Sequence, residues 1–307
     1  MADPPLLPKG GAVGTVAMAD GTPVRTFLLP HPRPAARLLL LNGRADFLEK
    51  WARLFAELGE AGFALAAFDW RGQGASGGKP GNGAGHIESF DLWLADLDRL
   101  LPWARAGLGG EVLLLGHSMG GHLALRWLAD ARGTVPALML TAPFCGFAQP
   151  VLVQRLVAAL ARRRVRQGRG EDYAPGQNPW GPHRMARARA AILTGDPVRF
   201  ADEGAAIAAN PALALGGVSW GWLAAAHSSL ARLRAAPLER LATPTLMLLA
   251  ARERLVSNRA ARAIAARLPD CRVEEVPGAA HEILREADGP RRHAISRIRD
   301  FAARHAQ

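Results

Sequence analysis

The sequence predicts an α/β fold with a mostly parallel β-sheet, helices on both faces of the sheet and an inserted helical cap. Short apolar runs alternate with segments of helical periodicity from residue 37 onward. This alternation stops in the segment 145–233. A serine lies between glycines where one apolar run passes into a helical segment. We therefore expect a core formed by residues 1–144 and 234–307, with the cap at 145–233.

Apolar runs of the length of buried strands recur along the core, and helical patterns separate them. The runs are 37–41, 64–68, 111–115, 137–141, 245–250 and 272–276. The helical patterns are 46–58, 90–101, 187–193, 222–233 and 291–305. Residues 15–18 and 24–29 flank a turn sequence and predict an antiparallel hairpin at the edge of the sheet.

The composition indicates a globular protein without a membrane-spanning helix. Hydrophobic residues make up 49% of the chain, enough for a sizeable core. No uninterrupted apolar run approaches the ~18 residues of a spanning helix. The segment 1–14 lacks a basic start followed by an apolar stretch, so we expect no secretory signal. Cys145 and Cys271 fit neither a metal site nor a disulfide framework, so we expect a cytoplasmic protein.

The net charge of +11 raises the question of a nucleic-acid partner. All but three of the 38 Lys and Arg residues are Arg, and they are spread along the chain among many alanines. This pattern is typical of biased amino-acid usage, and no nucleic-acid recognition motif accompanies it. We therefore expect no nucleic-acid partner.

The most informative motif is GHSMG at 116–120, which follows an apolar run and precedes a helical pattern. In such a strand–turn–helix unit, the tight turn lifts the serine hydroxyl above the strand ends. The flanking glycines are needed because Cβ atoms would clash in the strained backbone. We expect Ser118 to be a nucleophile; the alternative is a serine in a Gly-rich turn.

A nucleophilic serine needs a histidine base and an acid that orients the base. After a nucleophile elbow, the acid comes first along the chain and the histidine second. His281 is the expected base, because it lies between a late strand and the last helix. Glu253 is the expected acid, because it lies just past the run 245–250. The alternative for Glu253 is a surface glutamate paired with Arg252 or Arg254.

The oxyanion hole needs two backbone N–H donors. We expect Met119, directly after the nucleophile, to supply one. We expect Arg44, in the loop after the run 37–41, to supply the other. His281 also begins an H-E-x-x-H pattern, but residue 285 is Arg, so a zinc protease is excluded.

Together these motifs resemble α/β-hydrolases of the monoacylglycerol lipase and bacterial lysophospholipase group, also described as serine aminopeptidase-like hydrolases. The matching motifs are NGR at 42–44 followed by Trp51, FDWRGQGAS at 68–76, GHSMGG at 116–121, LTGDPVRF at 193–200, ERLV at 253–256 and GAAHE at 278–282. The resemblance spans nearly the whole chain and implies the α/β-hydrolase fold. It also implies that residues 69–74 form a structural turn beside the active site.

Two positions depart from the pattern of most members. Asn42 stands where most have His in the oxyanion loop. Since the donor in this loop is a backbone group, we expect catalysis to be retained. Glu253 stands where most have Asp, and some bacterial lysophospholipase-like members use Glu here, which points toward that branch.

The resemblance implies a serine hydrolase that cleaves carboxylic esters of single-chain lipids, either lysophospholipids or monoacylglycerols, through an acyl-enzyme. It implies no cofactor and no metal. One alternative is an aminopeptidase or amidase, which needs a carboxylate in the pocket to hold an amine. The cap carboxylates are Glu171, Asp172, Asp196, Asp202 and Glu203. The other alternative is a non-catalytic, membrane-associated lipid-binding protein.

A cluster of four arginines in the cap adjoins the apolar segment 151–160. The cluster consists of Arg162, Arg163, Arg164 and Arg166. We expect Val151, Leu152, Leu156, Val157 and Leu160 to form one apolar helix face. A basic end on an apolar helix suits an anionic membrane surface, which predicts peripheral contact with the inner membrane. The alternative is a solvated helix end that covers the core.

Overall fold

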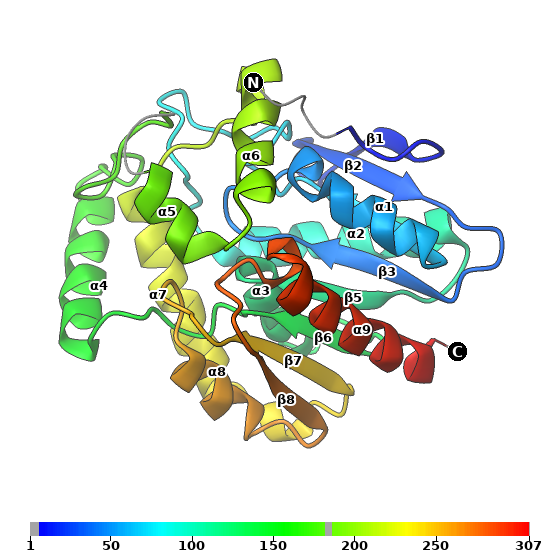
Figure 1. The fold of residues 1–307 in the computed structure, drawn as a ribbon. Coiled ribbons are helices and arrows are strands. Elements are labelled where there is room, and N and C mark those ends of the chain that lie inside the picture. Colours follow the sequence, from blue (N-terminus) through cyan, green and yellow to red (C-terminus); the bar gives the residue numbers. More distant parts are fainter. Residues whose placement is uncertain (1–5, 182–185, 307) are drawn as a thin grey trace.

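The computed structural model describes residues 6–181 and 186–306. In this part of the chain, eight strands form one sheet in the order β1-β2-β4-β3-β5-β6-β7-β8 (Figure 1). The strands are β1 (Ala12–Ala17), β2 (Pro23–Leu29), β3 (Ala36–Leu41), β4 (Phe63–Phe68), β5 (Leu113–His117), β6 (Leu138–Thr141), β7 (Thr245–Ala250) and β8 (Cys271–Val276). The pairs β1–β2 and β2–β4 are antiparallel and the others are parallel. The predicted parallel sheet and its edge hairpin are therefore confirmed.

Helices cover both faces of this sheet, and each face has its own apolar core (Figure 1). The helices on one face are α1 (Ala52–Glu60) and α9 (Asp288–His305). Those on the other face are α2 (Phe90–Leu108), α3 (Met119–Ala129) and α8 (Asn258–Ala265). Along β3, Leu38 and Leu40 enter the first core whereas Leu39 and Leu41 enter the second, because successive side chains of a strand point to opposite faces.

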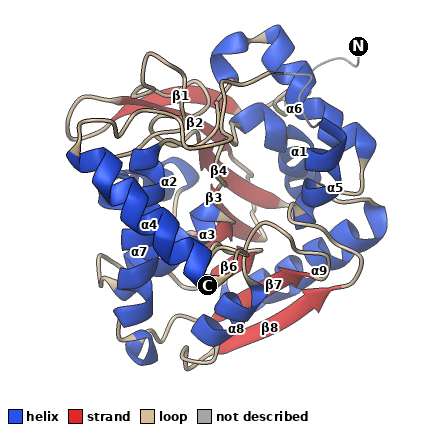
Figure 2. Ribbon diagram, turned by 90° about the vertical axis from the view of Figure 1, so that its left-hand side faces the viewer, coloured by secondary structure: helices blue, strands red, loops and turns tan. Residues whose placement is uncertain are grey.

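Between β6 and β7 the chain leaves the sheet and forms a group of helices. These are α4 (Val151–Arg166), α5 (Ala186–Leu193), α6 (Pro197–Ala209) and α7 (Trp220–Ala235). In both views α4 lies on the outer side of α7, and α6 lies beside α1 (Figures 1 and 2). The short 3₁₀ helices of the described chain are η1 (Leu48–Trp51), η2 (Pro211–Leu213), η3 (Leu238–Arg240) and η4 (Ile283–Arg285).

Two core elements begin later than the sequence predicts. β5 starts at Leu113 instead of Glu111, because its pairing with β3 begins there and Glu111 is exposed, paired with Arg105 at 2.7 Å. The α-helix predicted from residue 46 begins at Ala52 and is preceded by η1. Asp46 stays outside the helix, where its carboxylate accepts a hydrogen bond from a loop amide. The other predicted strands of the parallel sheet lie within one residue of the observed bounds.

Candidate active site

The loop between β5 and α3 holds Ser118 in a strained backbone conformation. Its φ of 50° and ψ of −114° lie in a region that L-residues rarely adopt. The end of β3 approaches this turn closely, since a Cβ on Gly120 would lie 2.0 Å from the carbonyl oxygen of Leu41. Glycine is therefore required at position 120, and the turn presents Ser118 at the carboxyl edge of the parallel strands.

The hydroxyl of Ser118 lies at one end of a chain of hydrogen bonds. Its Oγ is 2.9 Å from Nε2 of His281, and Nδ1 of His281 is 2.8 Å from Oε2 of Glu253. His281 lies in the loop after β8, and Glu253 lies in the loop after β7. The side chains of His281 and Glu253 are 3% and 2% exposed, so this chain of hydrogen bonds is shielded from water.

Both carboxylate oxygens of Glu253 accept hydrogen bonds. Oε1 accepts them from the backbone amides of Leu255, at 2.7 Å, and Val256, at 3.2 Å, while Oε2 faces His281. Burial raises the pKa of Glu253, but the hydrogen bonds and the nearby imidazole outweigh burial, so its pKa lies below the ordinary value. A carboxylate accepts but cannot donate, so it favours the proton of His281 on Nδ1 and leaves Nε2 free to accept one.

Arg44 and Met119 belong to two segments next to Ser118, the loop after β3 and the N-terminus of α3. Met119 is the first residue of α3, so its N–H belongs to the unpaired donors at a helix N-terminus. Gly43, which precedes Arg44, packs against the serine: a Cβ on Gly43 would lie 3.4 Å from Cβ of Ser118. Within residues 6–181 and 186–306, neither the Arg44 nor the Met119 amide donates to another protein group. Both amides are therefore available to an anionic oxygen.

Neighbouring side chains hold residues 42–45, the loop that we expect to contribute to the oxyanion hole and call the oxyanion loop. The amide of Gly43 donates to Oδ2 of Asp46 at 2.7 Å. The amide of Ala45, a residue with a φ of 62°, donates to the side-chain carbonyl of Gln73. Gln73 belongs to the turn 69–74, so that turn has the structural role implied by the resemblance.

Asn42, which replaces the histidine of most members, also serves to hold this loop. Its Nδ2 donates to the carbonyl of Phe68 at 2.9 Å, at the end of the neighbouring strand β4. Its own carbonyl accepts a hydrogen bond from Nε1 of Trp70, also at 2.9 Å. The Asn42 side chain therefore ties the loop to the end of β4, whereas the contact with Trp70 uses a backbone carbonyl that any residue at this position would offer.

A buried lysine joins the oxyanion loop to two other segments. The Nζ of Lys50 lies 2.6 Å from Asp46, 2.7 Å from Glu282 and 3.3 Å from Glu203. Asp46 holds the oxyanion loop, Glu282 directly follows His281, and Glu203 lies on α6. One cation therefore connects the oxyanion loop, the histidine loop and the segment between β6 and β7.

Lys50 and Glu282 stay charged because each compensates the burial of the other. Burial alone would lower the pKa of Lys50, but the three carboxylates outweigh it and hold that pKa above its ordinary value. Burial raises the pKa of Glu282, whereas Lys50 and Arg285 lower it by more, so its pKa lies below the ordinary value. Removing one member of this group of buried charges destabilises the fold, because it leaves another buried charge uncompensated.

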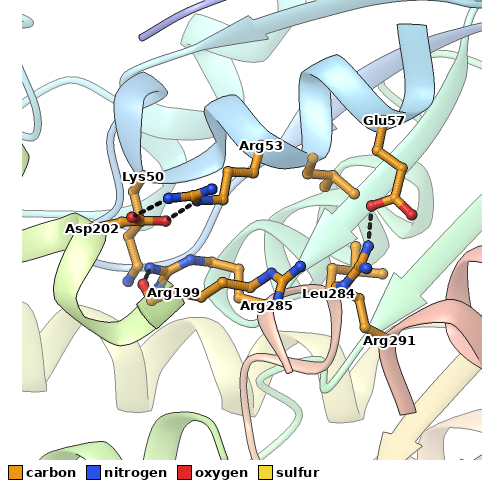
Figure 3. Close-up of a pocket in the computed structure, with 9 residues that line it drawn as sticks. Lys50, Arg53, Glu57, Arg199, Asp202, Leu284, Arg285 and Arg291 are labelled. Atoms are coloured by element: carbon orange, nitrogen blue, oxygen red, sulfur yellow. Dashed lines mark hydrogen bonds and ion pairs between the residues drawn. The ribbon is translucent and has the colours of Figure 1, made fainter. Parts of the chain in front are cut away.

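Further ion pairs dock α6 on the core around a small pocket (Figure 3). Arg53 of α1 pairs with Asp202 of α6 through Nε at 2.7 Å. Arg189 of α5 pairs with Glu203 at 2.7 Å. The Arg53 side chain is 51% exposed, so its pair is screened by water and contributes less than the buried Lys50 contacts.

His117 lies beside His281 and stays neutral. The two ring centroids are 5.1 Å apart, and Nδ1 of His117 is 3.1 Å from the hydroxyl of Thr141. Burial, followed by the nearby His281, lowers the pKa of His117 to about 4. At neutral pH, His117 therefore adds no positive charge beside the imidazole of His281.

The Lys50 cluster has only weak signals in the sequence. The available signal was the i,i+4 spacing of Asp46 and Lys50 in a predicted helix, together with Glu282 directly after the expected base. Glu203 gave no such signal, because only the tertiary structure brings α6 to Lys50.

We predict that Lys50→Met lowers the free energy of unfolding by about 3–5 kcal/mol, because it removes the cation paired with Asp46 and one of the two cations paired with each of Glu203 and Glu282. The measurement is urea unfolding followed by circular dichroism. Lys9→Met is the matched control, since Lys9 is exposed, and it should change stability by less than about 0.5 kcal/mol. Equal urea midpoints for both variants and the wild type would contradict a stabilising role of Lys50.

Known proteins resemble this chain along most of its length. Lysophospholipase L2 of Escherichia coli K12 is 30% identical over 305 residues, which cover 93% of this chain and 86% of that protein. The probable lysophospholipase L2 of Haemophilus influenzae is 28% identical over 278 residues, covering 89% of this chain and 86% of that protein. A solved structure of a soluble variant of monoglyceride lipase from Saccharomyces cerevisiae aligns over 100% of both chains, with a TM-score of 0.78 at 16% identity.

The likeness to the yeast structure concerns the fold, and together with the sheet order it confirms an α/β-hydrolase. The family model described as serine aminopeptidase, S33, matches residues 32–288. Since this match covers most of the 307 residues, the chain belongs to the serine aminopeptidase S33 family of α/β-hydrolases.

Proposed function

We propose that this enzyme hydrolyses carboxylic esters of single-chain lipids, lysophospholipids or monoacylglycerols, through an acyl-enzyme on Ser118. The observation that carries the proposal is the hydrogen-bonded chain from Ser118 through His281 to Glu253. A strained serine beside an oriented imidazole is the arrangement of an activated nucleophile. The names of the relatives, lysophospholipase L2 and monoglyceride lipase, support a single-chain lipid ester as the substrate.

In the proposed reaction, Oγ of Ser118 attacks the ester carbonyl while Nε2 of His281 takes the serine proton. The amides of Arg44 and Met119 hold the oxyanion, and Glu253 offsets the charge of the imidazolium. His281 returns the proton to the leaving alcohol. It then activates a water molecule, which releases the fatty acid and restores Ser118.

We place residues 145–233 as a cap over this site. The amides of His281 and Glu282 donate to carbonyls at the end of α5, at 3.3 Å and 2.7 Å. Ser118 itself is 8% exposed. The segment therefore contacts the histidine loop directly, as a cap that encloses a substrate would.

The amidase alternative is disfavoured because carboxylates of the cap are already paired with cations. Asp172 pairs with Arg169, Asp196 with Arg199, Asp202 with Arg53, and Glu203 with Lys50 and Arg189. Glu171 is exposed. An aminopeptidase needs a carboxylate free to hold the substrate amine.

The other alternative is a non-catalytic lipid-binding protein. The hydrogen bonds between Ser118, His281 and Glu253 favour an enzyme over this alternative.

The proposal predicts that Ser118→Ala lowers kcat about 10⁴-fold or more, because the variant cannot form the acyl-enzyme. The assay is a turnover panel of p-nitrophenyl esters, monoacylglycerols, lysophospholipids and aminoacyl amides. An unchanged circular dichroism spectrum controls for folding. Turnover limited to the aminoacyl amides, or turnover that persists in Ser118→Ala, would refute the proposal.

The variant Glu253→Gln tests whether Glu253 is the acid that orients His281. We predict a fall in kcat of about 10³–10⁴-fold with little change in KM. An amide at this position disturbs the tautomer of His281 and removes the charge that stabilises the imidazolium. Glu274→Gln is the matched control, because Glu274 pairs with His293 and Arg297 instead. A near-normal kcat for Glu253→Gln with a large loss for Glu274→Gln or Asp270→Asn would reverse the assignment.

The helix α4, which lies on the outer side of α7 (Figure 2), exposes apolar side chains in the turns before the arginine cluster. Val151, Leu152 and Leu156 are 50%, 76% and 71% exposed. Ala158 and Ala161 of the same helix are buried. The predicted single apolar face is thus wrong in part: Leu160 packs inward beside Ala161, because α4 rests on α7 along this side.

We propose that this face and its arginines contact an anionic membrane, where single-chain lipids enter the site. No helix of the described chain is long and apolar enough to cross a bilayer. Cys145 and Cys271 are free thiols, which supports a cytoplasmic, reducing location. Apolar side chains beside basic ones fit the interface of a leaflet with anionic lipids.

Replacing the arginine cluster should therefore weaken vesicle binding about tenfold or more at low salt, since each Arg near an anionic surface contributes about 1 kcal/mol. The measurement is co-sedimentation with anionic vesicles, using Gln at Arg162, Arg163, Arg164 and Arg166. The control carries Gln at the exposed arginines Arg259, Arg292, Arg299 and Arg304, so its net charge is the same. Equal binding by both variants, or no binding by the wild type, would contradict this contact.

A further inference from the structure

Glu286 is a buried carboxylate that takes no part in the proposed reaction. Its side chain is 1% exposed, and the residue directly follows η4. Its Oε1 accepts a hydrogen bond from the amide of Ala280 at 2.7 Å. Its Oε2 accepts hydrogen bonds from the amides of Gly195, at 2.8 Å, and Ala287, at 3.0 Å. One carboxylate therefore joins the histidine loop, the stretch between β8 and η4, to the proposed cap.

The amide that donates to Oε1 belongs to the residue directly before the proposed base. Ala280 precedes His281 and is fully buried, so its amide has no access to water. The ring of His281 makes two hydrogen bonds, to Ser118 at 2.9 Å and to Glu253 at 2.8 Å. Both bonds need the backbone of this loop to stay in place, because a displacement of about 1 Å would break them. A misplacement of that size can lower a reaction rate about 100-fold.

Other contacts hold the carbonyl groups of the same loop. The backbone amide and Nε of Arg252 donate to the carbonyls of Ala279 and Gly278, both at 2.8 Å. These contacts do not involve the amide of Ala280, for which Glu286 is the acceptor in the part of the chain that the structure describes. Removing the Glu286 carboxylate therefore leaves the loop attached but frees the amide next to the base.

We propose that Glu286 is a positioning residue for His281, which it holds through the amide of Ala280. This inference rests on the proposed function, in which His281 moves a proton. The oxyanion loop is held in a similar way, since the carboxylate of Asp46 accepts a hydrogen bond from the amide of Gly43 at 2.7 Å. A carboxylate suits this task because it accepts several hydrogen bonds at once and donates none.

The competing explanation is that Glu286 only fastens the proposed cap through Gly195. Thr194 offers a matched control, because it joins the same two segments and is buried as well. Its hydroxyl donates to the carbonyl of Arg285 at 2.7 Å. The variant Thr194→Val breaks this contact but leaves the amide of Ala280 bound to Glu286.

The first experiment measures kcat and KM for a p-nitrophenyl ester in Glu286→Gln. The two amides of Gly195 and Ala287 draw the single amide oxygen of Gln to their side, so its NH₂ group faces the amide of Ala280. We expect kcat to fall about 10–100-fold with KM within about threefold of the wild type, because the reacting groups are displaced and the substrate contacts are not. Thr194→Val should keep kcat within about threefold of the wild type.

Two further readouts separate positioning from folding. Urea unfolding gives the folded fraction of each variant, so that kcat is compared per folded molecule. The rate of reaction with a fluorophosphonate reports the pair of Ser118 and His281 without any ester, and it should fall with kcat in Glu286→Gln.

A measurement on the wild type alone does not depend on the folding of a variant. NMR-detected hydrogen exchange compares the amide of Ala280 with that of Gly278, which lies exposed in the same loop. The amide of Ala280 should exchange about 100-fold more slowly or less, because it is buried and bound to Glu286.

Three results would overturn the inference: an unchanged kcat in folded Glu286→Gln, an equal fall of kcat in Thr194→Val, or equal exchange rates of the two amides. The proposed function can still hold in these cases, since it does not require Glu286. If the wild type neither hydrolyses the ester nor reacts with the fluorophosphonate, the proposed function fails, and this inference fails with it.

Discussion

The contacts of the Lys50 ammonium are the constraint on which the arrangement of the site depends. Its carboxylate partners reach the oxyanion loop through Asp46, the histidine loop through Glu282, and α6 through Glu203. None of these segments is adjacent to another in the sheet order. A buried cation with three specified partners has few alternative arrangements, so it fixes the relative positions of loops that would otherwise be independent. Buried ion pairs contribute specificity in this way more than they contribute net stability.

The second constraint is the close approach of α3 to the end of β3. It forces glycine at position 120 and holds Ser118 at a positive φ, so the backbone strain at the nucleophile is maintained by the packed sheet. Because both faces of the sheet are buried, the strands cannot shift to relieve this strain. The amides around Ser118 are therefore oriented before any substrate arrives, which is the requirement for electrostatic stabilisation of an oxyanion.

Much of the core could be predicted from the sequence, because apolar runs and turn residues are local signals. The run 245–250 matches β7, and the order of strands places Ser118, Glu253 and His281 at one edge of a parallel sheet. The start of β5 was less predictable, since Val112 is as apolar as the strand but lies before the first pair with β3. The start of α1 could not be predicted, because Asp46, the first residue of the predicted helix, accepts a hydrogen bond from the oxyanion loop instead.

The parts of the site that could not be predicted involve contacts between distant segments. Nothing near Lys50 in the sequence indicates Glu203, and nothing near Arg44 indicates the carbonyl of Gly216. The direction of the Arg44 side chain follows from the packing of the segment between β6 and β7 against the core.

Covalent labelling is the sharpest test of Ser118 as the proposed nucleophile. The wild-type protein is treated with a fluorophosphonate, digested, and mapped by mass spectrometry. We expect a single phosphonylated residue, Ser118, because its Oγ lies 2.9 Å from Nε2 of the buried His281. Absence of labelling, or a label on a different residue, would contradict it.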